Sequence, residues 1–352
     1  MLYQTRNPHG GDLYSRPVTL DFSANINPFG TPQAVKDAVA ASVDSLRNYP
    51  DPYCRELTEA ISRYEGVEED CILCGNGAAE LIFSYCMALN PRRAMVLSPC
   101  FSEYETALTA LGREVDHYYL KKEDGFALTE AFLPVLSAFD GDLLMLCNPN
   151  NPTGQTIDPG LMERILEVCD ARGIRLFVDE CFLDLTEGGE QLSLKDLLHR
   201  YPGIFLLKAF TKSYGMAGLR LGYCLCGDAA LLRAMGRSVQ PWNVSIPAQK
   251  AGVAALAQKE FLEQAKEMIR SQRAWLTEAL RRLALEVIPS RTNYILFFSN
   301  RELQQPLLEV GIQIRSCENY PGLCRGWYRI AVKLPEENRR LIAAMEQILR
   351  EK

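Results

Sequence analysis

LKAFTKSYGMAGLRLGY, residues Leu207 to Tyr223, is the most informative stretch of this chain. The apolar run that enters it, Ile204 to Phe210, predicts a buried strand, and Lys212 follows at its end. A charged amine is costly to bury, and the cost falls when the amine is neutral or consumed in a covalent imine. Arg220 follows eight residues later and offers a planar fork suited to a phosphate. With the glycines of a tight turn, these residues indicate a pyridoxal phosphate site; the alternative is a lysine that snorkels from a strand end.

Apolar strands alternate with helices along much of the chain. Between residues 57 and 226 this alternation predicts an α/β fold with a mainly parallel sheet covered on both faces. Ligands of such sheets bind beyond the carboxyl ends of the strands, and Asn151, Asp179 and Lys212 all stand at such ends. A glycine-rich turn at residues 75–80 precedes a helix, whose free N-terminal amides favour an anion. The sequence therefore predicts a cofactor site at this edge of the sheet.

The composition is that of a soluble globular protein. Of 352 residues, 47% are hydrophobic and 23% are charged, and the net charge of −6 argues against a nucleic-acid partner. Apart from one CxxC at Cys71 and Cys74, the cysteines are single, so no metal site is expected. Twelve cysteines in apolar surroundings indicate a reducing cytoplasm. No apolar run is long enough for a membrane span, so no membrane partner is expected.

The length of the chain suggests two lobes, since a single core stops growing beyond about 250–300 residues. We expect an N-terminal arm with part of a small domain at residues 1–45, a large domain at 46–255 and a small α+β domain at 256–352. In this last part Arg315 and Arg329 stand at or near predicted strands. Arginine there indicates a bound anion or a paired acid, and the alternative is an exposed edge strand.

Three motifs in order carry a family resemblance: NPNNPTG at residues 148–154, DE at 179–180 and TKSYGMAGLRLGY at 211–223. Together they resemble the fold-type I pyridoxal phosphate enzymes of the aspartate aminotransferase superfamily, and the match covers nearly the whole chain. The resemblance implies a large domain built on a mainly parallel seven-stranded sheet, with a smaller α+β domain.

Two subgroups of that superfamily are similar to this chain, histidinol-phosphate aminotransferase and threonine-phosphate decarboxylase of cobalamin synthesis. Three further motifs look like the decarboxylase: HGGD at residues 9–12, DFSANINPFG at 21–30 and GIQIRSCENYPGL at 311–323. RNYPDP at 47–52 and the chain ending from Tyr328 suit both subgroups.

The resemblance implies roles for the cofactor residues. Lys212 would form the imine with pyridoxal phosphate and later move the proton at the substrate Cα. Asp179 would pair with the pyridine nitrogen and keep it protonated, which makes the ring an electron sink. Asn151 would donate to the ring 3′-oxygen, and Phe101 would stack on the ring face.

The resemblance also implies how the cofactor phosphate and the substrate carboxylate are held. The backbone amides of Ala78 and Ala79, with Arg220, would bind the cofactor phosphate, and Tyr49 would reach it from the other subunit of a homodimer. Arg329 would bind the substrate carboxylate in a bidentate pair.

Further substrate contacts follow from the same resemblance. Asn25 to Asn27 would supply backbone near the substrate carboxylate. The candidates for the substrate's own phosphate are His9 and Arg315, with Asn243 or Tyr294 as further candidates.

Three positions depart from the family pattern. Phe182 stands where aminotransferases usually have a tyrosine that donates to the ring 3′-oxygen, and the decarboxylases often have phenylalanine. Ala209 stands where a serine or threonine commonly contacts the cofactor phosphate, which removes about one hydrogen bond, ~1–3 kcal/mol. Asp12 replaces the more usual asparagine, and its charge leaves room for a different phosphorylated substrate.

These observations predict a pyridoxal-phosphate-dependent decarboxylase in the cytoplasm, acting on a small phosphorylated amino acid. O-phospho-L-threonine, converted to aminopropanol phosphate, is the favoured substrate, and O-phosphoserine is a close competitor. The first alternative is an aminotransferase that uses histidinol phosphate. A non-catalytic binding subunit of the same fold is a third reading, which the complete set Lys212, Asp179, Asn151 and Arg220 disfavours.

Overall fold

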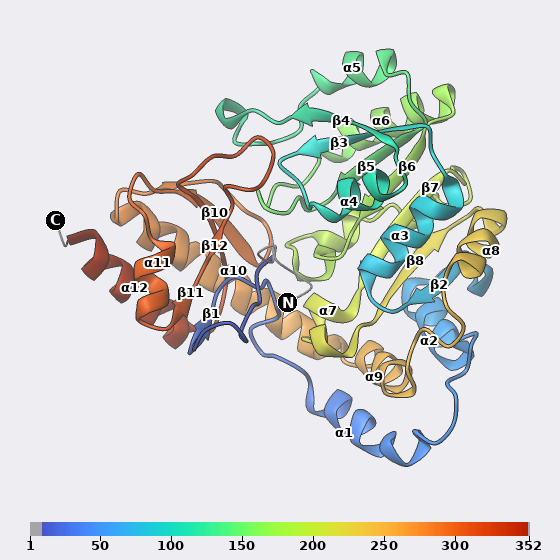
Figure 1. The fold of residues 1–352 in the computed structure, drawn as a ribbon, viewed down its shortest axis with the longest axis horizontal. Coiled ribbons are helices and arrows are strands. Elements are labelled where there is room, and N and C mark those ends of the chain that lie inside the picture. Colours follow the sequence, from blue (N-terminus) through green and yellow to red (C-terminus); the bar gives the residue numbers. More distant parts are fainter. Residues whose placement is uncertain (1–8, 351–352) are drawn as a thin grey trace.

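The computed structural model describes residues 9–350, so the part of the predicted arm before His9 lies outside the described residues. A seven-stranded sheet forms its centre (Figure 1). In spatial order its strands are β2 (Ile72–Gly75), β8 (Gly222–Cys226), β7 (Ile204–Ala209), β6 (Arg175–Asp179), β5 (Leu143–Cys147), β3 (Arg93–Ser98) and β4 (Glu114–Tyr119). The strands from β7 to β4 run parallel, and β8 runs antiparallel to both neighbours. The predicted mainly parallel sheet of seven strands is confirmed.

Helices cover both faces of this sheet. Successive side chains of a strand point to opposite faces, so each strand contributes to both layers. In β3, Val96 belongs to one cluster of buried apolar side chains and Leu97 to the other. The cluster with Val96 includes side chains of α3 (Ala78–Leu89), α4 (Glu103–Ala110) and α8 (Ala229–Ser238). The cluster with Leu97 includes side chains of α2 (Arg55–Glu65), α5 (Phe132–Ala138), α6 (Pro159–Arg172), α9 (Ile246–Leu256) and α10 (Lys259–Arg282).

Two smaller sheets lie beside the large one, next to the C-terminal helices (Figure 1). One is antiparallel and contains, in order, β12 (Arg315–Ser316), β13 (Trp327–Ala331), β10 (Tyr294–Phe298) and β9 (Glu286–Val287). The other pairs β1 (Leu20–Asp21) with β11 (Ile312–Gln313) in parallel. The C-terminal helices are α11 (Gln304–Glu309) and α12 (Pro335–Arg350). The pairing of β1 with β11 joins the N-terminal segment to this smaller part.

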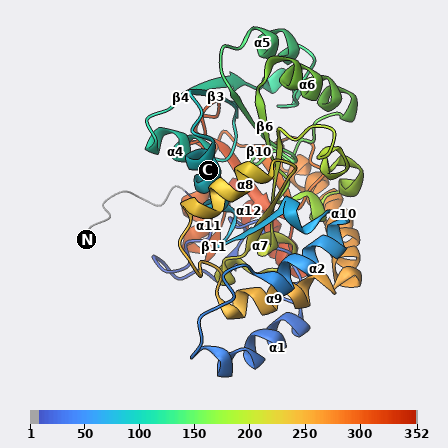
Figure 2. The same cartoon turned by 90° about the vertical axis from the view of Figure 1, so that its right-hand side faces the viewer.

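The remaining α-helices within residues 9–350 are α1 (Gln33–Ala41) and the short α7 (Phe210–Ser213). In Figures 1 and 2, α5 and α6 lie at one end of the molecule, and α1 and α9 lie together at the other. None of the helices within residues 9–350 is long and apolar enough to cross a membrane. The domain limits at residues 45 and 255 remain a prediction.

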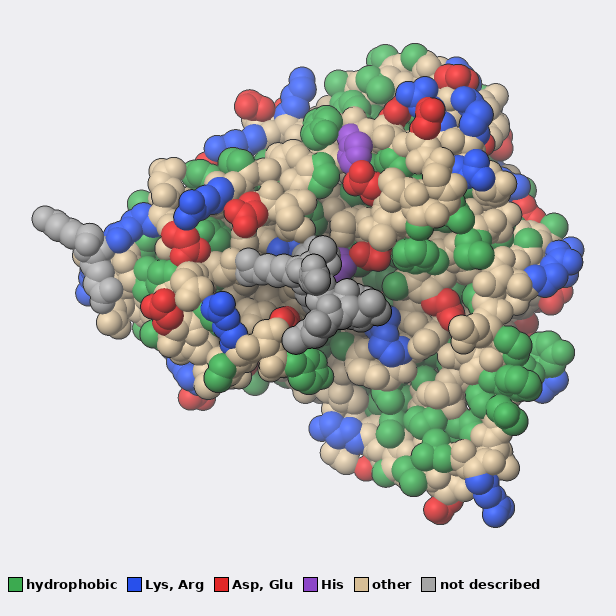
Figure 3. All heavy atoms as spheres, in the orientation of Figure 1, with side chains coloured by type: hydrophobic (Ala, Val, Ile, Leu, Met, Phe, Trp, Pro, Cys, Tyr) green, Lys and Arg blue, Asp and Glu red, His purple; other side chains and the backbone are tan. Residues whose placement is uncertain are grey.

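The surface mixes charges of both signs, and lysine, arginine, aspartate and glutamate side chains are interspersed in Figure 3. Hydrophobic side chains gather over the region of α2 in the same view. Large exposed apolar side chains stand on the segment between α1 and α2 and on the loop before α9: Val43, Leu46, Tyr49, Tyr53 and Trp242. Of these, the rings of Tyr49 and Trp242 stack at a centroid distance of 4.5 Å and form an exposed apolar patch that joins the two segments.

Candidate active site

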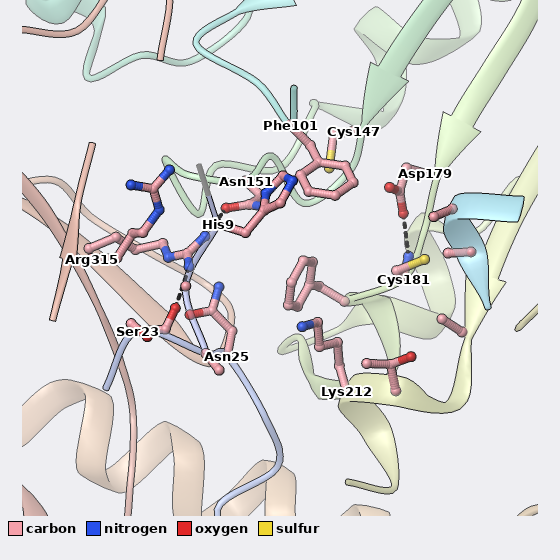
Figure 4. Close-up of a pocket in the computed structure, with 18 of the residues that line it drawn as sticks. His9, Ser23, Asn25, Phe101, Cys147, Asn151, Asp179, Cys181, Lys212 and Arg315 are labelled. Atoms are coloured by element: carbon pink, nitrogen blue, oxygen red, sulfur yellow. Dashed lines mark hydrogen bonds between the residues drawn. The ribbon is translucent and has the colours of Figure 1, made fainter. Parts of the chain in front are cut away.

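A cavity of about 240 Å³ lies beyond the carboxyl ends of β5, β6 and β7, against the smaller part of the chain. Figure 4 shows Asp179 and Lys212 on one side of it and Arg315 and Ser23 on the other. Of the predicted site residues, those that line this cavity are His9, Asn25, Ala78, Ala79, Phe101, Asn151, Asp179, Lys212, Arg220, Arg315 and Arg329. Among the described residues, no three His, Cys, Asp or Glu side chains are grouped to hold a metal ion.

Two lysines near the end of β7 have different surroundings. Lys208 is buried between the carboxylates of Glu65, at 3.3 Å, and Glu180, at 3.4 Å. Burial alone would lower the pKa of Lys208, but these two charges outweigh it and raise the pKa. Lys212 projects into the cavity, where desolvation by the surrounding protein and the positive charge of Arg329 lower its pKa to about 8. Lys212 is therefore the lysine that can present a neutral amine near neutral pH.

Asp179, the last residue of β6, is a buried carboxylate with two donors. Its Oδ1 accepts from the Cys181 backbone N–H at 2.9 Å, and its Oδ2 accepts from the Tyr104 hydroxyl at 2.6 Å. Burial raises the pKa of Asp179, and these hydrogen bonds offset part of that rise. The carboxylate keeps further lone pairs for a cationic partner in the cavity.

The glycine-rich turn and the start of α3 form an open cradle. Gly77 precedes the helix with φ 85°, a conformation that L side chains rarely adopt. A Cβ at Gly77 would overlap the Arg220 guanidinium. A Cβ at Gly222 would stand 2.9 Å from the Ala78 nitrogen. The two glycines therefore leave room beside the Ala78 and Ala79 amides, and free helix amides with a guanidinium are the donors that a phosphate takes.

Arg329 on β13 connects the cofactor side of the cavity to the N-terminal segment. Its guanidinium donates to Asn151 Oδ1 and, at 2.7 Å, to the carbonyl oxygen of Ser23. Because the Asn151 oxygen is engaged, the amide nitrogen is the group left to donate into the cavity. Arg329 Nε and Asn25 Oδ1 are buried and have no hydrogen-bond partner among the described residues. Such groups are costly to leave unpaired, so they indicate a polar ligand.

Arg315 supplies a second cation at the same end. It stands opposite Arg329 in the register of β12 and β13. Its guanidinium donates to Asn319 Oδ1 at 2.8 Å and to the Ser316 carbonyl, and it lies 5.2 Å from the centroid of the Tyr320 ring. Residues of its own segment therefore hold this guanidinium at the cavity.

His9 lies over the cavity beside Phe101 (Figure 4). The two ring centroids are 5.7 Å apart, and His9 Nε2 is 2.8 Å from Glu103 Oε1 at the start of α4. His9 thus brings an imidazole ring to the border of the cavity.

Four candidates lie outside the cavity lining. The Asn27 side chain donates to the Ser213 carbonyl at 2.8 Å, and its backbone N–H donates to the Lys212 carbonyl at 3.0 Å. Asn27 therefore holds the backbone behind Lys212. The other three are Tyr49, which is 77% exposed in the apolar patch, Asn243, which donates to Glu80, and Tyr294, which donates to the Asn150 carbonyl.

The three departures from the family pattern have distinct settings. Asp12 lies in an exposed turn outside the cavity lining, where it accepts hydrogen bonds from Ser15 and Tyr14 that lower its pKa. Phe182 lines the cavity with its ring centroid 5.8 Å from Lys212 Nζ. Ala209 also lines the cavity and brings no hydroxyl to it.

Sequence reasoning missed several side chains of the site. Tyr104 donates a hydrogen bond to Asp179. The cavity is also lined by Ser23, Tyr320, Cys147 and Cys181. For Tyr104 the only signal is its place three residues after Phe101, and the two ring centroids are 5.7 Å apart.

Comparisons with known proteins agree with this geometry. The family model of aminotransferase class I and II matches residues 17–345. The chain is 40% identical to the threonine-phosphate decarboxylase of Salmonella typhimurium, over 97% of this chain and 96% of that protein. It is 36% identical to the histidinol-phosphate aminotransferase of Desulfitobacterium hafniense, over 96% of this chain and 93% of that protein. The crystal structure of the histidinol-phosphate aminotransferase from Clostridium acetobutylicum has a TM-score of 0.88 at 27% identity, covering 95% of this chain and 100% of that one.

This chain therefore belongs to the aminotransferase class I and II family. It is a pyridoxal-phosphate-dependent enzyme, as the sequence predicted, and the cradle before α3, the buried Asp179 and the amine of Lys212 fit that cofactor.

Proposed function

We propose that this enzyme decarboxylates a phosphorylated α-amino acid, with O-phospho-L-threonine converted to aminopropanol phosphate in cobalamin biosynthesis. The observation that carries the proposal is the opposition of Arg315 and Arg329 at one end of the cavity, with His9 over it. A phosphorylated amino acid has two anionic groups, and separate cationic groups match them. The 40% identity to a threonine-phosphate decarboxylase supports the same substrate. O-phosphoserine is a close competitor, since one methyl discriminates by only ~1–3 kcal/mol.

In this proposal the cofactor is held by residues of the large sheet. The amides of Ala78 and Ala79 with Arg220 bind its phosphate. Asp179 pairs with the ring nitrogen, Asn151 donates to the 3′-oxygen, and Phe101 covers one face of the ring and excludes water. When bound, pyridoxal phosphate supplies an electron sink that stabilises negative charge at the substrate Cα.

Arg329 and Lys212 then determine which bond at Cα breaks. Arg329 Nε, which has no partner among the described residues, and the remaining Nη hydrogens bind the carboxylate. A fixed carboxylate restricts rotation about the bond between the amino nitrogen and Cα. The bond to the carboxylate is therefore the one held in the orientation for cleavage. The Lys212 amine, with a pKa of about 8, can hold a proton and deliver it to Cα near neutral pH.

The alternative is an aminotransferase with histidinol phosphate as the amino donor. The relative in Desulfitobacterium hafniense favours it, and the same cofactor residues would serve. Histidinol phosphate has a phosphate but no carboxylate, so it would leave one of the two arginines unmatched. Phe182 also favours the decarboxylase, because it lacks the hydroxyl that aminotransferases commonly direct to the 3′-oxygen.

We further propose that the enzyme is a homodimer in the cytoplasm. The apolar patch supports the dimer, since exposed apolar side chains that gather in one place mark interaction surfaces. Tyr49 lies in that patch, from where it would reach the cofactor phosphate of the partner subunit. The twelve cysteines are all free, which supports a reducing compartment.

A substrate panel tests this proposal. The enzyme loaded with pyridoxal phosphate is offered O-phospho-L-threonine, O-phospho-L-serine or histidinol phosphate, each with and without 2-oxoglutarate, with L-threonine as the unphosphorylated control. We expect CO₂ without any keto acid, fastest from O-phospho-L-threonine. Glutamate formed from histidinol phosphate only when 2-oxoglutarate is present would make the enzyme an aminotransferase instead.

A further inference from the structure

Two motifs that are distant in sequence from the cofactor residues, HGGD and DFSANINPFG, meet at Ser23. Ser23 follows β1, is 1% exposed and lines the cavity. The Gly11 N–H donates to Ser23 Oγ at 2.8 Å. Gly10 packs so closely on the Ser23 carbonyl that a Cβ at Gly10 would overlap the carbonyl oxygen. Residues 9–16, named the arm below, are thus docked on Ser23 at the two glycines that follow His9.

The Ser23 hydroxyl is held from two further directions. It donates to Asp21 Oδ1 at 2.6 Å and accepts from Gln313 Nε2 at 3.1 Å. Asp21 and Gln313 are themselves opposite in the pairing of β1 with β11. With the bond from Gly11, the hydroxyl uses its one donor and both acceptor positions, so its orientation is fixed.

The backbone carbonyl of Ser23 holds Arg329, the arginine proposed to bind the substrate carboxylate. It accepts from Arg329 Nη2 at 2.7 Å. His9 is two residues from the docked Gly11 amide, and its ring rests against Phe101 and Glu103. One buried residue therefore touches both the arm that carries His9 and the guanidinium of Arg329.

We propose that Ser23 is a positioning residue, whose hydroxyl docks the arm so that His9 is held at the substrate's phosphate while its carbonyl aligns Arg329 with the carboxylate. The identity of that phosphate rests on the proposed function. Because the two tasks use different atoms, they can be separated: removal of the hydroxyl frees the arm, whereas the bond from Arg329 to the backbone remains. This arrangement also explains the glycine at position 10, since a Cβ there would overlap the Ser23 carbonyl.

The test uses the holoenzyme and two independent variants. Ser23→Ala removes the hydroxyl, and Gly10→Ala keeps the hydroxyl but adds a Cβ where the Ser23 carbonyl lies. Tyr14→Phe, which removes a hydroxyl from a side chain of the arm that is 98% exposed, is the matched control. We measure amide hydrogen exchange over residues 9–16 without substrate, and the ratio of kcat/KM for O-phospho-L-threonine to that for L-threonine.

In both docking variants the amides of the arm are expected to exchange faster. The ratio of kcat/KM values is expected to fall about tenfold, mainly through KM. Tenfold is the factor that corresponds to the loss of one hydrogen bond of about 1.4 kcal/mol. Tyr14→Phe is expected to match the wild type. A released arm with an unchanged ratio, or unchanged exchange in both variants, would overturn the proposal. If the wild type does not act on phosphorylated amino acids, the proposed function fails, and the exchange rates still decide whether Ser23 docks the arm.

Discussion

Replacement of Tyr104 by phenylalanine removes a hydroxyl that donates a hydrogen bond to the Asp179 carboxylate, and it is expected to shift the pH dependence of activity. The Tyr104 hydroxyl donates to Asp179 Oδ2 at 2.6 Å, and both side chains are buried. Burial raises the pKa of Asp179, and the hydrogen bonds from Cys181 and Tyr104 lower it. A hydrogen bond to a charged group contributes about 1.5–3 kcal/mol. At 1.36 kcal/mol per unit this corresponds to about one to two pKa units.

The sign of the shift follows from the charge that Asp179 must carry. Only the ionised carboxylate keeps the ring nitrogen protonated, so activity is lost as the pH falls through the pKa of Asp179. Without the Tyr104 hydroxyl that pKa rises, and the acid limb of the kcat/KM profile moves up by about one to two pH units. Activity on that limb falls about 10- to 100-fold, whereas activity on the plateau changes little. The assay is kcat/KM with O-phospho-L-threonine at a series of pH values.

Tyr85→Phe is the matched control. Tyr85 is buried on the same face of the sheet, and both tyrosine rings contact Phe177, at centroid distances of 5.2 Å for Tyr85 and 5.7 Å for Tyr104. The Tyr85 hydroxyl has no hydrogen-bond partner among the described residues. An acid limb that stays in place in Tyr104→Phe, or that moves equally in both variants, would refute the reasoning.

Three further variants test other parts of the site. Gly222→Ala places a Cβ 2.9 Å from the Ala78 nitrogen, so the dialysed enzyme should need about tenfold more pyridoxal phosphate for half-reactivation; wild-type retention would count against the cradle. Arg329→Gln removes a charge that lowers the pKa of Lys212, so the midpoint of cofactor loading should rise above pH 8; an unchanged midpoint would contradict that assignment. Trp242→Ala removes the ring that stacks on Tyr49, so the dissociation constant of the dimer, measured by sedimentation, should rise about tenfold. An unchanged dissociation constant would place the interface elsewhere.

The convergence of the cofactor residues could be predicted because it follows from topology. Asn151 follows β5, Asp179 ends β6 and Lys212 follows β7, and these three strands are neighbours in the sheet. Apolar runs identify buried strands, and parallel strands bring their carboxyl ends to one edge. The chain's local patterns therefore contained the position of the site and most of its cofactor residues.

Contacts between distant elements could not be predicted in the same way. Tyr104 and Asp179 are far apart in sequence, and nothing in the pattern near Tyr104 marks a carboxylate partner. Asn27 illustrates the opposite case, since it stands in a predicted substrate loop, yet its side chain turns to the Ser213 backbone. Which way a side chain turns depends on packing between elements, and strand and helix periodicity carry no information about that packing.

The fate of the carboxyl carbon tests the central claim most directly. The holoenzyme is given O-phospho-L-threonine labelled at C1, with no keto acid present. We expect the label to leave as CO₂, in equal amount to the aminopropanol phosphate formed. Label that stays in a phosphorylated keto acid, with no CO₂ released, would contradict it.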